Sequence, residues 1–218
     1  MYCLDSRLRA LLFDFDGLLL DTESAEFRAW CELYERHGQT LELSTWSRAI
    51  GTLGGFDPSE HLRSLGSPPS AEALADQKRR VLDLCERENF LPGVDSLLRD
   101  ARSRGLQTCI VSSSSRGWIE GHLNRRCGLE PFDAIVCANG DPARAKPRPT
   151  LYLEALECLG VNADQAIAFE DSPNGIAAAK AAGLFCVAVP NRLTASLDLC
   201  AADVVLESLA HCRLDAIP

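Results

Sequence analysis

Two aspartates lie two residues apart, directly after the first apolar run of the chain. Asp14 and Asp16 follow Ala10–Phe13 (ALLF), and Gly17 comes next, where the chain turns away. The apolar run is typical of a buried strand in a parallel sheet, and ligands of such sheets bind beyond the carboxyl ends of the strands. Residues i and i+2 of a strand point to the same side. The two carboxylates can therefore converge on one reacting centre, which suits a nucleophile and an acid/base partner.

Three further groups of polar residues accompany later apolar runs. The run QTCIV leads into the serines at 112–115, Lys146 lies in AKPRPTLYLEAL, and the run AIAFE ends in Glu170 and Asp171. Each group alone has an ordinary interpretation, as a turn, a loop, a surface cation or acidic residues favourable at a helix N-terminus. Their recurrence at the ends of expected strands predicts a single site.

The second half of the chain alternates short apolar runs with helical patterns, which is typical of a parallel, doubly wound α/β sheet. Ser172 and Pro173 form the clearest helix start, with serine as the N-cap and proline in the first helical position. We expect strands at 106–111, 134–138, 166–169, 184–189 and 204–206, and helices at 94–104, 116–127, 151–159 and 173–182.

Residues 22–89 interrupt this alternation, because helical patterns recur there without a convincing strand. The helices are expected at 24–37, 44–50, 58–65 and 71–88. The fold class predicted is therefore α/β: a doubly wound, Rossmann-like core formed by 1–21 and 90–218, with an inserted all-helical cap domain at 22–89.

Composition limits the class of protein. With 218 residues, of which 46% are hydrophobic, the chain can bury a full core. The net charge of -9 and the lack of a basic stripe argue against a nucleic-acid partner. No apolar stretch approaches the roughly 20 residues needed to span a bilayer, and the first residues do not form a signal peptide. We expect a cytoplasmic protein without a membrane partner, and no signal indicates its oligomeric state.

The ten cysteines are scattered, and none forms a CxxC or CxxH pair. Zinc ligand spacing is therefore absent. Cys109, Cys137 and Cys186 lie inside apolar runs, which predicts buried thiols that pack as small hydrophobic residues. Free thiols fit a reducing compartment.

The motifs FDFDGLLLDTE, SSSS, AKPRPT and FEDSPNG, in this order, resemble those of the haloacid dehalogenase superfamily of phosphohydrolases. The resemblance covers nearly the whole chain, and it is closest to the subgroup with a small helical cap, which contains β-phosphoglucomutase and many sugar-phosphate phosphatases. It implies a Mg²⁺-dependent phosphomonoester hydrolase that forms an aspartyl-phosphate. The implied substrate is a small phosphate ester of a sugar or polyol.

The resemblance also implies a metal site. A phosphate monoester is dianionic and repels a carboxylate nucleophile, so attack by Asp14 requires a divalent cation. Mg²⁺ prefers hard oxygen ligands. Those implied are the Asp14 carboxylate, the Asp16 backbone carbonyl and Asp171, with Glu170 as a ligand or a neighbour of the ligands.

The remaining implied roles concern the phosphate and its proton donor. Lys146 would balance charge on the phosphate and Asp14, and Asp16 would protonate the leaving group and then activate water. A serine would donate a hydrogen bond to a phosphoryl oxygen. Position directly after the strand favours Ser112, whereas the subgroup pattern favours Ser113, which we prefer.

Departures from related sequences separate the possible activities. Mutases of the β-phosphoglucomutase type resemble DTxEYHxxW and carry an arginine in the cap, whereas this chain has Glu26 at the histidine position and Gly54 near the arginine position. Asp16 argues against cleavage of a carbon–halogen bond, which needs no proton donor. Thr150 replaces the Asp of the KPxPD motif and is predicted to cap the next helix.

A phosphosugar mutase is the alternative enzyme, and a non-catalytic phosphate-ester binding or regulatory module is the alternative from another class. Binding alone would not require an acid/base residue at position 16. In this subgroup the cap supplies specificity, and Arg116 follows the serine run at the start of a helix, where a guanidinium suits recognition of a distal anionic group. The candidate substrate-binding residues are Glu26, Arg48, Thr52, Ser114 and Arg116.

Overall fold

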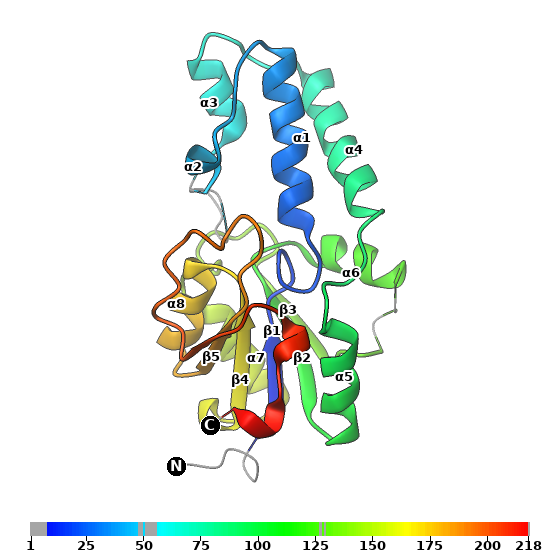
Figure 1. Cartoon of the computed structure of the whole chain (residues 1–218), viewed down its shortest axis with the longest axis vertical. Coiled ribbons are helices and arrows are strands. Elements are labelled where there is room, and N and C mark those ends of the chain that lie inside the picture. Colours follow the sequence, from blue (N-terminus) through cyan, green and yellow to red (C-terminus); the bar gives the residue numbers. More distant parts are fainter. Residues whose placement is uncertain (1–7, 48–49, 51–55, 127, 129, 218) are drawn as a thin grey trace.

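The computed structural model describes residues 8–47, 50, 56–126, 128 and 130–217 (Figure 1). Six parallel strands form one sheet in the order β3-β2-β1-β4-β5-β6, so the first strand lies in its middle. The strands are β1 (Ala10–Phe13), β2 (Gln107–Ser112), β3 (Ala134–Cys137), β4 (Ala166–Glu170), β5 (Phe185–Ala188) and β6 (Val204–Val205).

Helices cover both faces of this sheet, as the doubly wound prediction requires. Alternate residues of β1 explain how. Ala10 and Leu12 pack in the cluster with α7 (Thr150–Leu159) and α8 (Pro173–Ala181). Leu11 and Phe13 pack in the cluster with α5 (Val94–Ser103) and α6 (Arg116–Asn124). A strand buried on both faces needs a continuous apolar run. The core helices are α5 (Val94–Ser103), α6 (Arg116–Asn124), α7 (Thr150–Leu159) and α8 (Pro173–Ala181), with short 3₁₀ helices η2 (Ala163–Gln165), η3 (Leu209–His211) and η4 (Leu214–Ala216).

The predicted strands and core helices are all present, with ends shifted by one residue except at α6, which ends at Asn124. The Ser172 prediction is confirmed, since its Oγ accepts a hydrogen bond from Gly175 N at 3.3 Å. The Thr150 prediction is wrong: Thr150 is the first residue inside α7, and Pro149 occupies the N-cap position without a side-chain cap bond.

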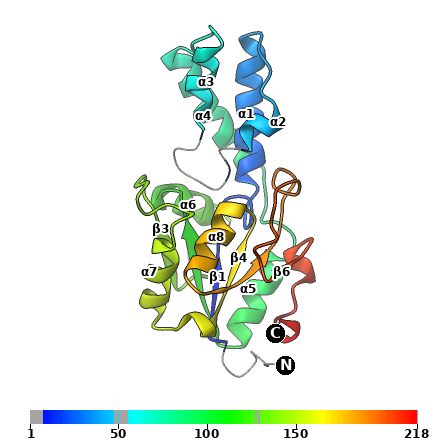
Figure 2. The ribbon, with the colours of Figure 1, turned by 90° about the vertical axis from the view of Figure 1, so that its left-hand side faces the viewer.

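The inserted segment carries four helices above the sheet, which we call the cap (Figures 1 and 2). The described residues of 22–89 contain no strand. The long helices α1 and α4 run side by side, and Arg80 Nε and Nη2 of α4 bind both carboxylate oxygens of Glu32 of α1, at 2.8 and 2.9 Å. The domain boundaries stay a prediction. The cap helices are α1 (Thr22–Arg36), α2 (Leu43–Trp46), α3 (Pro58–Ser64) and α4 (Ala71–Cys85).

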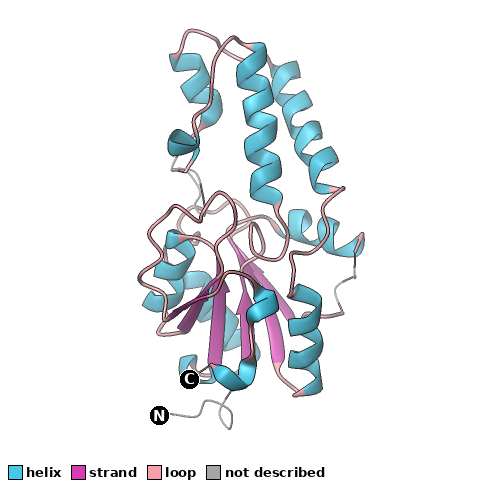
Figure 3. Cartoon of the chain, viewed as in Figure 1, coloured by secondary structure: helices cyan, strands magenta, loops and turns pink. Residues whose placement is uncertain are grey.

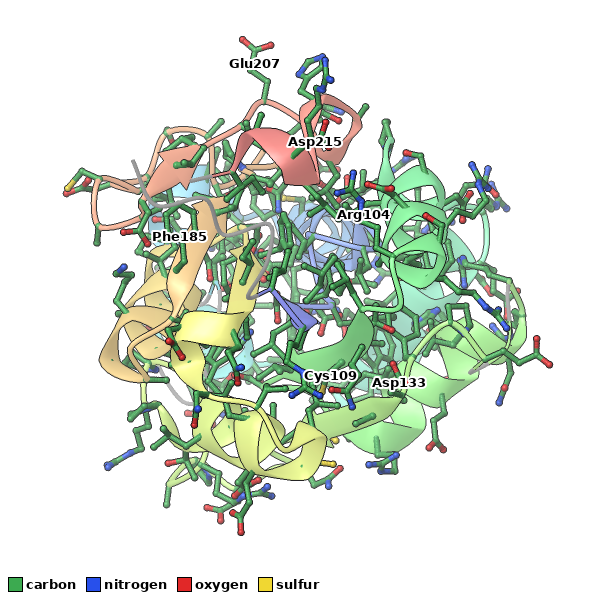
Figure 4. All side chains as sticks on the ribbon, turned by 90° about the horizontal axis from the view of Figure 1, so that it is seen from below. Arg104, Cys109, Asp133, Phe185, Glu207 and Asp215 are labelled. Atoms are coloured by element: carbon green, nitrogen blue, oxygen red, sulfur yellow. The ribbon has the colours of Figure 1, made fainter. Side chains whose placement is uncertain are left out.

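The strands point toward the cap, so their carboxyl ends and the loops after them face it (Figure 3). The opposite end of the sheet carries the end of the chain, where Arg104 at the end of α5 lies beside Asp215 of η4 (Figure 4). Arg104 Nη2 donates to Asp215 Oδ1 at 2.7 Å. Chemistry at the sheet is thus directed to the end that the cap covers.

The predicted burial of the cysteines at 109, 137 and 186 is confirmed, and the described cysteines are free thiols. Burial raises the pKa of Cys109 to about 12. A thiol held in its neutral form is a poor nucleophile and metal ligand, so these residues serve packing. Among the described residues, no helix combines the length and the apolar character needed to cross a membrane.

A close approach at Gly93 supplies a test of the fold. Gly93 has φ +99°, and a Cβ there would lie 2.0 Å from Ala210 N and 2.2 Å from Leu209 C. Gly105 has φ +68° and no described atom within 4 Å of its Cβ position. We expect Gly105→Ala to lower the free energy of unfolding by about 1 kcal/mol and Gly93→Ala by about 3 kcal/mol or more. Urea unfolding measures both, and equal losses would contradict the packing of η3 on Gly93.

Candidate active site

A cavity of about 330 Å³ lies between the carboxyl edge of the sheet and the cap. It brings together residues that are far apart in the sequence, including most of the predicted site. The predicted residues that line it are Asp14, Asp16, Glu26, Ser113, Ser114 and Lys146. The remaining lining residues are Thr22, Glu23, Trp30, Trp46, Ile50, Phe56, Pro58, Ser112, Trp118 and Ser172.

Lys146 is buried between two carboxylates at the base of the site. Its Nζ lies 2.5 Å from Asp14 Oδ1 and 2.6 Å from Glu170 Oε1, and Tyr152 OH donates to the same Glu170 oxygen at 2.5 Å. Lys146 is only 2% exposed. Burial lowers the pKa of its ammonium, but the two carboxylates outweigh burial and raise that pKa above its ordinary value. The site therefore holds a fixed positive charge beside Asp14.

Asp14, Glu170 and Asp171 form a buried acidic cluster, with one carboxylate oxygen from each lying within 4.8 Å of the others. Burial, reinforced by Glu170 and Asp16 and opposed by Lys146, raises the pKa of Asp14 to about 7. Burial, with the negative charge of neighbouring carboxylates, also raises the pKa of Asp171 well above its usual range. Neighbouring buried carboxyl groups oppose one another's ionisation, and a bound cation stabilises their charged forms.

The donor set fits a hard divalent cation, which takes oxygen ligands. Glu170 Oε2 is buried and has no hydrogen-bond partner among the described residues. Asn191 Nδ2 donates to Asp171 Oδ2 at 2.7 Å and to Gly17 O at 3.2 Å, which fixes one oxygen of the cluster. Gly175 must lack a side chain, because a Cβ there would lie 1.8 Å from Glu170 Oε2. Three carboxylates and one ammonium leave a net negative site for a cation.

Four donors from the part of the chain that the structure describes hold the carboxylate of Asp16. Thr22 Oγ1 and Trp118 Nε1 donate to Oδ1 at 2.7 and 2.8 Å. Ser112 Oγ and Ser114 Oγ donate to Oδ2 at 3.3 and 2.6 Å. These partners come from the start of α1, from α6 and from the end of β2 with its following loop. Asp16 is thus fixed at the junction of core and cap.

The serine run turns its hydroxyls in different directions. Ser112 is 1% exposed, and its Oγ also accepts from Ser114 N at 3.0 Å. Ser113 Oγ accepts from Lys146 N at 3.2 Å and so lies beside the lysine that pairs with Asp14. Ser114 Oγ donates to Asp16 Oδ2.

The specificity candidates are placed unequally. Glu26 lines the cavity on the cap side. Loss of hydration, and then the charge of Asp16, raise the pKa of its carboxyl group above the ordinary value, against a hydrogen bond from Trp30. Glu26 is an exposed residue, so solvent screening limits this rise. Arg48 and Thr52 lie outside the described residues.

Arg116 does not line the cavity. Its guanidinium donates to Glu120 Oε1 at 3.1 Å and to Ile135 O at 2.5 Å, and its side chain is 49% exposed. The predicted helix start is confirmed, because Arg116 is the first residue of α6. The side chain instead turns along its own helix, as i,i+4 pairing with Glu120 favours.

Sequence reasoning missed four residues that hold the site: Thr22, Trp118, Tyr152 and Asn191. Thr22 was visible in the DTE motif, and Asn191 follows β5 at the same edge of the sheet. Nothing in the local sequence of Trp118 signals that its indole turns toward Asp16.

The chain is similar to known proteins along most of its length. The family model of haloacid dehalogenase-like hydrolases matches residues 8–183. The chain is 43% identical over 209 residues to the "Putative phosphatase YhcW" of Bacillus subtilis (strain 168), covering 95% of this chain and 94% of that protein. It is 32% identical over 206 residues to validoxylamine A 7'-phosphate phosphatase of Streptomyces hygroscopicus subsp. limoneus, covering 94% and 96%.

Solved structures share the fold over nearly the whole chain. CbbY from Rhodobacter sphaeroides, as an Asp-to-Asn mutant in complex with xylulose-(1,5)bisphosphate, has a TM-score of 0.76 at 28% identity, covering 94% of this chain and 96% of that one. β-Phosphoglucomutase from Clostridium difficile has a TM-score of 0.72 at 25% identity, covering 94% and 93%. The resemblance inferred from the motifs is confirmed.

The strained acidic cluster predicts a stability effect. Burial raises the pKa of Asp14 from its ordinary 3.8 to about 7 in the folded protein. A raised carboxyl pKa means that the stability of the metal-free protein falls as pH rises between these two values. We expect Asp14→Asn to exceed the wild type in unfolding free energy by about 2 kcal/mol above pH 7, with a much smaller gain near pH 4.5.

Urea unfolding in EDTA measures this difference in unfolding free energy. Lys146→Met is the control, because it should lower the unfolding free energy instead of raising it. Removing the ammonium leaves the carboxylates of Asp14 and Glu170 buried without compensation, so this variant should lose about 3 kcal/mol. An Asp14→Asn protein no more stable than the wild type at pH 8 would contradict the description of the cluster as strained.

Proposed function

Because the chain belongs to the haloacid dehalogenase-like hydrolases and is a phosphatase, we propose that it hydrolyses a small phosphate monoester through an aspartyl-phosphate formed on Asp14. The observation that carries this proposal is the position of Asp14, at the end of β1 and on the cavity wall, 2.5 Å from a buried ammonium. A carboxylate so placed can attack phosphorus while Lys146 offsets the negative charge that gathers around it.

Mg²⁺ is the cofactor that we propose. The Asp14 carboxylate, the Asp16 backbone carbonyl and Asp171 would hold it, with Glu170 as a further ligand or as the partner that orients the others. When bound, it supplies positive charge that lowers the repulsion between the phosphate dianion and the attacking carboxylate. The acidic cluster, with its buried and unsatisfied Glu170 oxygen, supports this assignment.

Ser113 is the hydroxyl that we propose for a phosphoryl oxygen. It lines the cavity and lies beside Lys146, whereas Ser112 is engaged with Asp16 and with the backbone of its own loop. A phosphoryl group attached to Asp14 would then meet Lys146 and Ser113 together.

Asp16 would act as the acid/base residue. It first donates a proton to the departing alkoxide and then accepts one from the water that hydrolyses the aspartyl-phosphate. Its carboxylate lines the cavity and is held by fixed donors on both oxygens. The two-step reaction requires the same group as acid and then as base.

A sugar or polyol phosphate is the substrate class that the cavity favours. Aromatic side chains of the cap, Trp30, Trp46 and Phe56, can cover the carbon faces of such a leaving group, and the carboxylate of Glu26 can accept hydrogen bonds from its hydroxyls. The relative that dephosphorylates validoxylamine A 7'-phosphate supports a small phosphorylated metabolite. Free cysteines favour a cytoplasmic location.

A phosphosugar mutase is disfavoured because Glu26 stands where the mutases have a histidine. Gly54, near the position of the mutase arginine, lies outside the described residues. A purely binding or regulatory module is disfavoured because binding alone would not require a carboxylate at position 16, where Asp16 lines the cavity. Phosphate release separates the three: a mutase conserves phosphate, and a binding module leaves the ester intact.

A panel of phosphate esters tests the proposal, with and without Mg²⁺. We expect release of inorganic phosphate that stops in EDTA and returns with Mg²⁺, while Ca²⁺ inhibits because its more flexible coordination misplaces the nucleophile. Asp14→Asn should lose at least about a thousandfold in kcat, since the covalent nucleophile is gone. Retention of a tenth of the wild-type activity by Asp14→Asn, or full activity in EDTA, would refute the mechanism.

Asp16→Asn should separate substrates by their leaving groups. A sugar alkoxide leaves poorly without a proton, whereas p-nitrophenolate leaves readily on its own. We expect the first step, measured in a single turnover, to fall at least about a hundredfold for a sugar phosphate and by a much smaller factor for p-nitrophenyl phosphate. Equal losses for both substrates would assign Asp16 a structural role.

A further inference from the structure

The described partners of Asp16 differ in chemical kind. Thr22, Ser112 and Ser114 contact it through hydroxyls, which can donate or accept. Trp118 contacts it through an indole N–H, 2.8 Å from Oδ1, and this group can only donate. When Asp16 gains a proton, the hydroxyls can reverse their hydrogen bonds, but the indole cannot.

This asymmetry distinguishes the two oxygens of Asp16. The carbonyl oxygen of a protonated carboxyl group accepts hydrogen bonds better than its hydroxyl oxygen does, so the fixed donor favours the carbonyl form at Oδ1. The proton is then directed to Oδ2, the oxygen that faces Ser112 and Ser114. That loop also carries Ser113, which lines the cavity beside Lys146.

The indole itself is held from several sides. His122, one turn further along α6, meets the Trp118 ring edge to face, with centroids 4.3 Å apart, and lies in turn 6.2 Å from the ring of Phe15. Trp118 also packs against an apolar cluster of the cap. That cluster consists of Ala25 and Ala29 of α1 and Val81, Leu84 and Cys85 of α4.

A second contact ties α6 to the same part of the cap. Arg126 donates to His122 O at 2.9 Å, to Cys85 O at 2.5 Å and to Glu88 O at 2.7 Å, which satisfies carbonyls at the end of α4. The helix that carries Trp118 is therefore joined to the cap through both apolar packing and hydrogen bonds.

We propose that Trp118 is a positioning residue for Asp16: its indole N–H orients the carboxyl group so that Oδ2 carries the proton delivered to the leaving group, and the cap holds the indole in place. This inference rests on the proposed function, in which Asp16 is the general acid. The sequence motifs of the site do not include Trp118, so the proposal gives the core helix α6 a new role in protonation of the leaving group.

Trp118→Phe tests the role of the N–H, because it keeps an aromatic ring against His122 and the cap. The first-step rate is measured in single turnovers with a sugar phosphate and with p-nitrophenyl phosphate. We expect a loss of about tenfold or more with the sugar phosphate, as for a hydrogen bond to a charged group, and less than about threefold with p-nitrophenyl phosphate. Equal losses with both substrates would overturn the proposal.

The same substitution in the Asp16→Ala background completes a double-mutant cycle. If Trp118 acts through Asp16, the sugar-phosphate rate of Asp16→Ala should change by less than about twofold when Trp118→Phe is added. A loss of tenfold in both backgrounds would mean that Trp118 acts on the fold or on the substrate, and would refute a positioning role.

Two further variants guard against ambiguity. Site-specific replacement of Trp118 by benzothienylalanine keeps the fused ring and exchanges N–H for sulfur, so it should reproduce the effect of Trp118→Phe even if the phenylalanine variant packs poorly. Tyr34→Phe is the control, because it removes an aromatic O–H of the cap that donates to Pro58 O at 2.7 Å and belongs to a residue outside the cavity lining. It should leave the ratio of the two rates unchanged.

The outcome separates this inference from the proposed function. A wild-type protein that releases no phosphate from any ester contradicts the proposed function itself. A wild-type phosphatase whose leaving-group ratio is untouched by benzothienylalanine at position 118 contradicts only the role of Trp118. In that case the hydroxyls around Asp16 suffice to orient it.

Discussion

The buried ion pair network of Lys146 is the constraint on which the rest of this structure depends. A lone ammonium with 2% exposure would be prohibitively unstable, and it persists because Asp14 and Glu170 both lie within 2.6 Å. These partners end two adjacent strands, β1 and β4, whose register pairs Phe13 with Phe169. The order of the sheet therefore brings the two carboxylates side by side, and the loop before α7 brings the lysine.

The same network is arranged for a ligand and not for stability. Asp171 adds a third carboxylate, so one ammonium faces three acidic groups, and burial raises the pKa of Asp14 and of Asp171. Well-packed proteins avoid such a surplus of buried charge unless something binds there. The close approach of Gly175 to Glu170 and the hydrogen bond from Asn191 to Asp171 show that neighbouring elements fix these carboxylates in place.

The fold and the grouping of the candidate site residues were predictable from the sequence, because both follow from periodicity and strand ends. Continuous apolar runs identify parallel strands, and polar residues directly after such runs must meet at one edge of the sheet. Asp14, Lys146 and Asp171 accordingly lie where the motifs placed them.

Side-chain direction across elements was not predictable, since it depends on contacts formed only in three dimensions. Arg116 begins α6 as expected, yet Glu120 and the Ile135 carbonyl draw its guanidinium away from the cavity. Trp118 turns toward Asp16 because His122 and the cap close off the other side. Thr150 failed as a cap because the helix starts one residue earlier than its motif suggested.

The two aspartates of the first motif differ in what holds them. Asp14 is paired with Lys146 of the core, whereas Asp16 is bonded to Thr22, the first residue of a cap helix, and to Trp118, which packs on the cap. A shift of the cap would therefore change the surroundings of Asp16, the proposed acid/base residue, while leaving Asp14, the proposed nucleophile, and Lys146 in place. In the proposed mechanism, attack on phosphorus, which is common to all phosphate esters, would then depend on the core. Protonation of the leaving group, which differs between substrates, would depend on the cap.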